Sequence, residues 1–265
     1  MAFRLGVDVG GTFTDLLLMD EDTGNTYEAK VHSTPGDSSV GVFAGIDRVC
    51  SIAGVNPSQI DQIMHGTTVA TNAILQGQGA KMGLVTTKGY RQVLQIERAF
   101  VPGGLAAFIV WNMPDPLVDL ELTVEADERV SARGEVVTSL EENGVRTELE
   151  YLKNKGIESL TVSLVNSYAN GDHERRIRDI AGEVMPGVPV SISSEILPEM
   201  YEFERTLTTA ANAYVAPVIA NYLGRVQNEL GDRGIDANLH ILRSDGGLAS
   251  VDMVQAAPVN VLMSG

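Results

Sequence analysis

The pattern of hydrophobic and polar residues predicts three short strands at the start of the chain. Residues 4–9, 14–20 and 26–32 are predicted strands, the second of them rich in leucine. Gly10-Gly11 and the run Asp22-Thr23-Gly24-Asn25 lie between them, and both are typical of tight turns. The opening of the chain is therefore expected to fold as a β-meander.

The hydrophobic period then changes to that of a helix. A helix is predicted from a cap at Asp37 or Ser38 to Gly54, with its apolar residues three or four positions apart. Strand and helix then alternate over residues 60–65 (strand), 69–76 (helix), 81–86 (strand) and 90–97 (helix). The resulting order, βββαβαβα, resembles a half-domain of the actin/Hsp70/sugar-kinase superfamily. We therefore expect an α/β fold, actin-like (ribonuclease H-like), with a βββαβα core.

The middle of the chain interrupts this pattern. Glycine and proline pairs break the period from residue 98 to about residue 143, which indicates an inserted α+β subdomain with short strands at 122–125 and 135–138. Alternation resumes over residues 141–155 (helix), 160–165 (strand), 172–185 (helix), 188–193 (strand), 203–230 (helix) and 240–243 (strand). Pro217 falls inside the last helix and is expected to kink it.

Composition narrows the function classes. The formal net charge is −16, which disfavours nucleic acid as a partner because phosphate backbones bind clustered Lys and Arg. The same acidity repels ATP, so a phosphate site must rely on backbone N–H groups and a divalent cation. No apolar run reaches the roughly 20 residues of a membrane span, and the first residues show neither the apolar stretch nor the cleavage site typical of a signal peptide, so we expect no export or membrane insertion. A single cysteine, Cys50, suits the reducing cytoplasm.

The strongest local motif is the segment from Asp8 to Asp15 at the first turn. Gly10 and Gly11 allow the backbone to approach a phosphate closely, and Thr12 and Thr14 add hydroxyl donors. Asp8, near the end of the first strand, is placed to hold Mg²⁺ through water. The alternative is an ordinary Gly-Gly hairpin. The βββαβα order favours the phosphate loop, with Gly10, Gly11, Thr12 and Thr14 as cofactor-binding residues.

A second motif runs from His65 to Asn72, where the fourth strand ends and a helix begins. In actin-like half-domains this strand end faces the γ-phosphate, and the helix N-terminus favours an anion. We predict catalytic roles for His65, Thr67 and Thr68, with His65 polarising or deprotonating a substrate group. The alternative is that His65 is a core histidine and Thr67 or Thr68 caps the helix.

Two further features are interpreted as structural. The run His173-Glu174-Arg175-Arg176 opens a helix without a partner His at metal-ligand spacing, so it is predicted to be a solvated face. Cys50 lies on an apolar helix face, which argues against a catalytic thiol.

The motifs together resemble the N-terminal region of the hydantoinase/oxoprolinase family, in order and over essentially the whole chain. The matching segments are residues 7–15, 65–73 and 83–89, Ser167-Tyr168 with residues 173–176, residues 193–199, residues 212–215 and Ser244-Asp245-Gly246-Gly247-Leu248. Family members include 5-oxoprolinase, N-methylhydantoinase, caprolactamase and the acetone and acetophenone carboxylases. Residues 98–104 depart from the oxoprolinase version and are closer to the N-methylhydantoinase and acetophenone carboxylase versions, which disfavours oxoproline as the substrate.

The resemblance implies an ATP- and Mg²⁺-dependent amidohydrolase that phosphorylates and opens a hydantoin or lactam, with a hydantoinase B-type partner subunit. A carboxylase subunit of the acetone or acetophenone type, a non-catalytic assembly module and a sugar kinase are the alternatives. The implied division is an actin-like phosphate-1 half-domain at 1–97, an inserted region at 98–200 and the start of the second, hydantoinase A domain at 201–265. The family continues beyond this point with a second phosphate loop and an adenosine pocket, so the chain is expected to be C-terminally incomplete.

It follows that the isolated 265-residue chain should have negligible ATPase activity, because it holds one half of the expected nucleotide clamp. Phosphate release from MgATP by the purified chain measures this. Sustained turnover would contradict the expectation.

Overall fold

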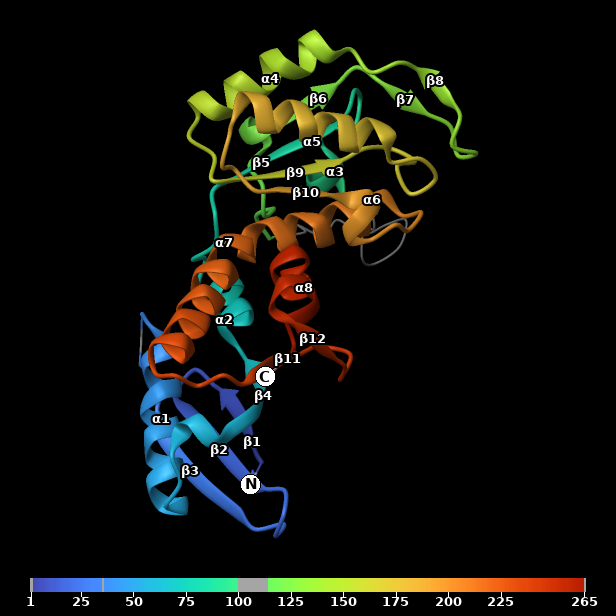
Figure 1. Ribbon diagram of the computed structural model, residues 1–265. Helices are drawn as coiled ribbons and strands as arrows, with labels where there is room; N and C mark the ends of the chain where they lie inside the picture. The colour runs from blue at the N-terminus through green and yellow to red at the C-terminus, as the bar shows by residue number, and fades with distance from the viewer. Residues whose placement is uncertain (1, 35, 100–113, 265) are drawn as a thin grey trace, which may run out of the picture. The chain divides into compact units, whose positions relative to one another are not determined.

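The computed structural model describes residues 2–34, 36–99 and 114–264 (Figure 1). By packing, the chain divides into two compact units. Unit 1 combines Met1–Gly79 with Val215–Gly265, and unit 2 is Ala80–Tyr214. Each unit has its own sheet and its own core.

Unit 1 is built on a mixed sheet of six strands in the order β12-β11-β4-β1-β2-β3. Its strands are β1 (Phe3–Val9), β2 (Phe13–Asp20), β3 (Thr26–His32), β4 (Ile60–Thr67), β11 (Asn238–Leu242) and β12 (Leu248–Ser250). The first three pair antiparallel, which confirms the predicted meander. β4 pairs parallel with β1 on one side and with β11 on the other.

Helix α1 (Ser38–Ala53) and the part of α7 (Glu202–Asp232) that follows Tyr214 pack on one face of this sheet. The Asp37 side chain accepts the amide of Ser39 at the start of α1, and Gly54 ends the helix at φ 72°, as the sequence predicts. Alternate residues of each strand point to opposite faces, so Leu5 and Val7 are buried while Asp8 is exposed on the other face.

The place beside β4 is taken by β11 and not by the predicted strand at 81–86. That strand, β5 (Met82–Thr87), lies in the sheet of unit 2. The insertion therefore begins at Ala80, directly after α2 (Val69–Leu75), and the core resumes at Val215 inside α7. Every residue of β5 is buried, and such a strand has no exposed face that would tell from sequence which sheet it joins.

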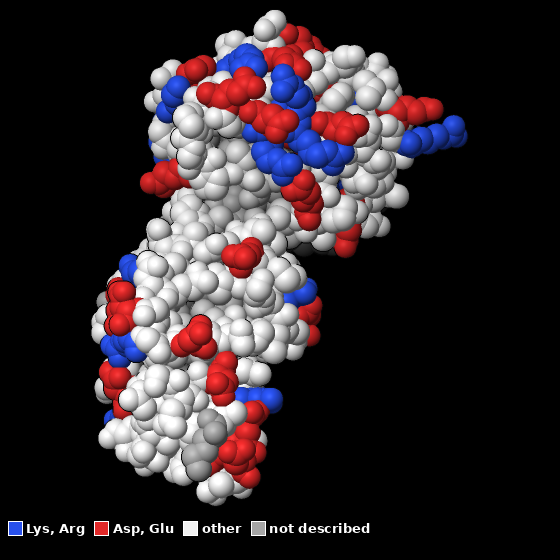
Figure 2. Space-filling view, viewed as in Figure 1, with Lys and Arg blue, Asp and Glu red and all other residues white. Residues whose placement is uncertain are grey.

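Unit 2 is a parallel sheet of four strands in the order β10-β9-β5-β6. Its remaining strands and helices are α3 (Val93–Ile96), β6 (Thr123–Ala126), α4 (Glu142–Asn154), β9 (Ser159–Ser163), α5 (Asp172–Val184), β10 (Val190–Ile192), α6 (Ser193–Ile196) and the two-stranded β7 (Arg129–Val130) and β8 (Val136–Thr138). Figure 2 shows basic and acidic side chains interleaved over α4 and α5, where Arg176 pairs with Glu142.

The solvated face predicted for residues 173–176 at the start of α5 is confirmed for the exposed Arg175 and is wrong for His173 and Glu174. Glu174 is fully buried and accepts the amides of Leu164 and Ser194 at 2.9 and 2.8 Å. His173 Nδ1 lies 2.7 Å from the buried carboxylate of Glu128. The loop after β9 and the first turn of α6 leave N–H groups that need an acceptor, and Glu174 provides it.

Short elements were not predicted from the sequence. They are α8 (Val251–Ala256), β7, α6, β12 and the 3-10 turns Pro57–Gln59, Leu120–Leu122 and Pro258–Val261. α7 continues through Pro217 as a single helix. The compact units differ from the expected ranges 1–97, 98–200 and 201–265, whose separate roles stay a prediction. Among the described residues, no helix is both long and apolar enough to cross a membrane.

Close packing of α1 on β2 is testable at Gly45. A Cβ at this position would lie 2.1 Å from Cδ1 of the buried Leu16. We expect Gly45→Ala to lower the free energy of unfolding by about 1–3 kcal/mol, because overpacking forces a buried side chain from its rotamer. Urea denaturation followed by circular dichroism measures the change.

Gly182→Ala in α5 is the matched control. A Cβ there meets nothing within 4 Å, so alanine should leave the free energy of unfolding unchanged or raise it by up to about 1 kcal/mol. Equal effects of the two substitutions would contradict the close contact between α1 and β2.

Candidate functional site

The turn between β1 and β2 is a fixed loop with two free amides. The Gly10 amide donates to Phe13 O at 3.0 Å, and a Cβ on Gly10 would lie 3.0 Å from that oxygen. Ser33 holds the loop in place with two hydrogen bonds: its amide donates to Thr12 O and its hydroxyl donates to Gly10 O. Neither the Gly11 nor the Thr12 amide donates to another described residue, so both can bind an anion.

Thr14 lies beneath this loop and not at its surface. Its side chain is fully buried, and its hydroxyl lies 3.0 Å from that of Ser33. Of the four residues predicted to bind a cofactor, Gly10, Gly11 and Thr12 form the loop, whereas Thr14 supports it. The role of each toward a ligand stays a prediction.

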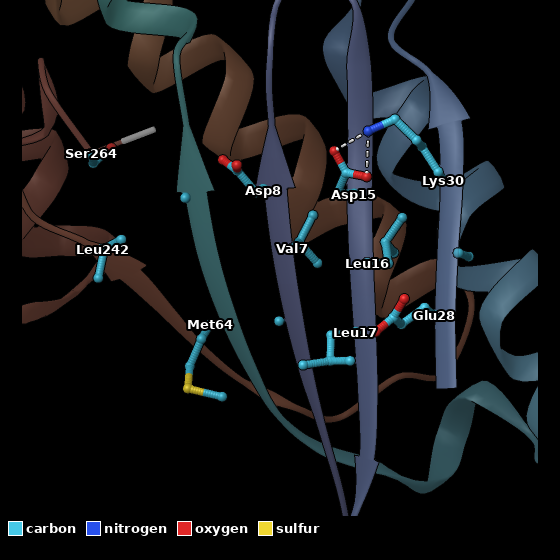
Figure 3. A pocket seen from close by; sticks show the side chains of 13 residues that line it. Val7, Asp8, Asp15, Leu16, Leu17, Glu28, Lys30, Met64, Leu242 and Ser264 are labelled. Atoms are coloured by element: carbon cyan, nitrogen blue, oxygen red, sulfur yellow. Dashed lines mark hydrogen bonds and ion pairs between the residues drawn. The ribbon is translucent and has the colours of Figure 1, made fainter. Parts of the chain in front are cut away.

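Asp8 points away from the helices, on the exposed face of the sheet. It stands opposite Asp15 on β2 and Gly66 on β4. Figure 3 shows Lys30 turned toward Asp15, with Nζ 2.7 and 2.8 Å from the two carboxylate oxygens, while Asp8 takes part in no ion pair with a described residue. The Lys30 ammonium thus neutralises Asp15 and leaves the charge of Asp8 available.

A glycine keeps space open beside Asp8. A Cβ at Gly66 would lie 3.4 Å from Asp8 Oδ1 and 3.1 Å from Ser264 O. Asp8, Gly66 and Ser264 line a hollow of about 900 Å³ on this face of the sheet. The described residues contain no cluster of three or more His, Cys, Asp or Glu able to hold a metal, so a cation here would keep much of its water.

His65 lies on the opposite face from Asp8. It pairs in register with the buried Val7, is 1% exposed, and its Nε2 lies 2.8 Å from the hydroxyl of Tyr222 on α7. Burial lowers the pKa of His65 to about 4 and raises the pKa of Tyr222. The imidazole is therefore neutral near pH 7 and has a tyrosine as its neighbour; its predicted catalytic role stays a prediction.

The two threonines at the end of β4 connect the strand to α2. Thr67 is 1% exposed, and its hydroxyl accepts the amide of Val69. Thr68 donates to Val9 O from both its amide and its hydroxyl, at 3.0 Å each. These two bonds hold the start of α2 beside the glycine loop.

Asn72 completes this corner, and it was not predicted as a site residue. Its Nδ2 donates to the Thr68 hydroxyl at 3.2 Å and would lie 3.7 Å from a Cβ on Gly11. The spacing of Thr68 and Asn72, one helical turn apart at a strand-to-helix junction, was the available signal. Residues 262–264 approach the same corner, where Ser264 Oγ donates to Thr67 O.

The structure thus brings Asp8, Gly10, Gly11, Thr12 and Thr68 to one edge of the sheet. Residues 4–185 match the family model described as the hydantoinase/oxoprolinase N-terminal region, and residues 205–265 match the hydantoinase/oxoprolinase model. The chain belongs to the hydantoinase/oxoprolinase family. The family predicted from the motifs is confirmed.

Relatives in this family catalyse different reactions. The chain is 31% identical to the caprolactamase alpha subunit of Pseudomonas jessenii over 267 residues, which covers 99% of the chain and 38% of that subunit. It is 35% identical to the acetophenone carboxylase gamma subunit of Aromatoleum aromaticum, over 93% of the chain and 36% of that subunit. The chain therefore spans less than two-fifths of the length of these relatives.

Solved structures of the family have the same fold. A nucleotide-free acetone carboxylase, described as ATP-dependent, matches 98% of the chain with a TM-score of 0.88 at 28% identity. The ATP-dependent caprolactamase from Pseudomonas jessenii matches 97% of it with a TM-score of 0.86 at 29% identity. The chain covers 38% of each of those structures, and the predicted actin-like fold class is confirmed.

Burial of His65 predicts a dependence of stability on pH. The unfolded chain titrates this histidine near 6.5 and the folded chain near 4, so the unfolded state binds more protons between these values. The free energy of unfolding should therefore fall as pH falls from 6.5 to 4, by at most about 1.4 kcal/mol per pH unit from this group.

The contribution is isolated by comparison with His65→Gln. We expect the difference in the free energy of unfolding between the natural protein and this variant to shrink steadily from pH 6.5 to pH 4.5. Urea titrations at each pH measure it. A difference independent of pH would mean that His65 is solvated.

Proposed function

We propose that this chain forms the first phosphate-binding half of an ATP-dependent enzyme that phosphorylates and opens a cyclic amide, such as a hydantoin or a lactam. The observation that carries the proposal is that the Gly11 and Thr12 amides and the nearby Asp8 carboxylate have no hydrogen-bond or ion-pair partner among the described residues. A chain with a net charge of −16 needs local donors and a divalent cation to hold a triphosphate, and this corner offers two amide donors and a carboxylate that could hold the cation.

The residues present fit MgATP. The Gly11 and Thr12 amides would bind phosphate oxygens, and Asp8 would hold Mg²⁺ through water in the space that Gly66 leaves open. Mg²⁺ supplies neutralisation of charge on the transferring phosphoryl group. Lys30 keeps Asp15 neutralised, so that the corner presents one carboxylate and not two.

The proposed chemistry needs an acceptor oxygen near the loop. An amide oxygen bonds to the terminal phosphorus while the bond from phosphorus to the ADP oxygen breaks. Water then adds to the amide carbon, the ring C–N bond breaks and its nitrogen takes up the proton. The acyl phosphate that remains is hydrolysed by a second water to a carboxylate and inorganic phosphate. Thr68 and Asn72 stand at the loop and can orient this amide. His65 is fully enclosed, so we propose that it positions the end of β4 through Tyr222.

We further propose that the enzyme works with a hydantoinase B-type partner subunit. The relatives named as alpha and gamma subunits of larger enzymes support this. A cytoplasmic location suits Cys50, whose burial raises the pKa of its thiol to about 11 and so disfavours its oxidation.

A carboxylase subunit is the second candidate. The 35% identity to an acetophenone carboxylase gamma subunit favours it, since this identity is higher than the 31% to the caprolactamase alpha subunit and the 29% to a 5-oxoprolinase. ATP hydrolysis by the protein as it is made in the cell, with its partner subunits, separates the two. Stimulation by hydantoins or lactams without bicarbonate supports the amidohydrolase, and stimulation by aryl ketones only with bicarbonate replaces it with the carboxylase.

Asp8 provides the sharpest variant. Asp8→Asn keeps the size of the side chain and removes its charge, so we expect the stimulated rate of ATP hydrolysis to fall by roughly 100-fold, partly restored by excess Mg²⁺. Asp61→Asn, the same change on an exposed residue at the start of β4, should leave the rate unchanged. Equal rates for both variants would refute the metal role of Asp8.

A further inference from the structure

A second hollow lies on the helix side of the glycine loop. It has a volume of about 400 Å³ and lies within unit 1. Its walls come from the loop, from α2 and from the second half of α7. The residues used below are Gly11, Thr68, Asn72, Val218, Tyr222 and Arg225.

We propose that this hollow binds the cyclic amide, with the amide oxygen toward the phosphoryl group held at Gly11. The proposal rests on the function proposed above and adds to it the place and the class of the acceptor. Gly11 belongs to the loop and also lines the hollow, so a ligand there stands next to Gly11, whose amide donates to no other described residue. A volume of about 400 Å³ is sufficient for a five- to seven-membered ring with a small substituent.

The lining favours a neutral ligand with both a donor and an acceptor. One N–H of the Asn72 carboxamide donates to the Thr68 hydroxyl, and its second N–H and its C=O can complement the C=O and N–H of a ring amide. Val218 provides an apolar wall for the ring carbons. A ketone has only an acceptor and would leave half of this carboxamide unpaired.

Charge argues against bicarbonate in the hollow. Arg225 is the single cationic side chain among the described residues that line it, and no described acidic side chain does so. The Nε of Arg225 lies 3.7 Å from Asp37 Oδ1, so its charge is partly compensated, and its side chain is 52% exposed. Apart from the loop amides, which this scheme assigns to the phosphoryl group, the hollow would therefore give an anion little gain over water.

The buried pair of His65 and Tyr222 has a structural role in this scheme. Tyr222 lines the hollow, and its hydroxyl lies 2.8 Å from His65 Nε2. The histidine on β4 thus fixes a wall side chain on α7 without touching the ligand. His65 is accordingly a positioning residue in this scheme.

The test uses the protein as it is made in the cell, with its partner subunits, and the cyclic amide that best stimulates ATP hydrolysis. Val218→Phe fills the hollow, and Asn72→Ala removes the carboxamide in a helix that tolerates alanine. For each variant we expect the KM for the amide to rise at least tenfold. The Kd for a fluorescent ATP analogue should change less than twofold. Val137→Phe, on the exposed strand β8 of unit 2, is the matched control and should change neither value.

The outcomes separate the two proposals. If no cyclic amide stimulates ATP hydrolysis by the natural protein, both the function proposed above and this inference are refuted. If stimulation is present but both variants keep the natural KM, the hollow is not the amide site while the function stands. If the Kd for the nucleotide rises together with the KM, the hollow belongs to the nucleotide and the inference is overturned.

Discussion

The parallel pairing of β1 with β4 is the constraint on which the rest of unit 1 depends. This register sets Asp8 opposite Gly66 and Val7 opposite His65, so one strand pair creates an open carboxylate on one face and a buried imidazole on the other. The two bonds from Thr68 to Val9 O extend the pairing past the last strand residues. They bring the start of α2 beside the glycine loop, where Asn72 reaches it.

Small residues matter at this corner because the backbone itself is the binding surface. Gly10 has no room for a side chain against Phe13 O, and Gly66 keeps the space beside Asp8 clear. Nearby charges are compensated locally, as with Lys30 on Asp15. An acidic protein can thus present a small anion-binding edge without a basic patch.

Local signals in the sequence were sufficient for the strands, the long helices and the glycine loop. Alternation along β1, the turn at Gly10-Gly11 and the caps Asp37 and Gly54 each depend on neighbouring residues, and the structure has them where predicted. The sheet that β5 joins could not be predicted from neighbouring residues, because a strand buried on both faces fits either sheet. Glu174 was misjudged because its partners, the amides of Leu164 and Ser194, are distant in sequence.

The residues of the candidate site likewise fall into those predictable from local sequence and those that depend on distant partners. Asp8 and the loop were predicted from their place at a strand end, whereas the side of the sheet to which His65 points depends on its pairing partner. Successive residues of a strand point to opposite faces, so a shift of one residue in the pairing would move His65 from the buried face to the exposed face. Asn72 was missed because its closeness to Gly11 arises from the Thr68 bonds and not from its own neighbours.

The discontinuity of unit 1 has a consequence for biosynthesis. β4 emerges from the ribosome early, but its neighbour β11 follows only after all of Ala80–Tyr214 and the second half of α7. At typical translation speeds this delay is on the order of ten seconds. During that time β4 is an unpaired edge of the kind that recruits other strands, while unit 2, contiguous in the chain, can already fold. The order of synthesis thus favours folding of unit 2 before unit 1. Until β11 is made, the open edge of β4 is the part of the nascent chain that most needs protection by a chaperone.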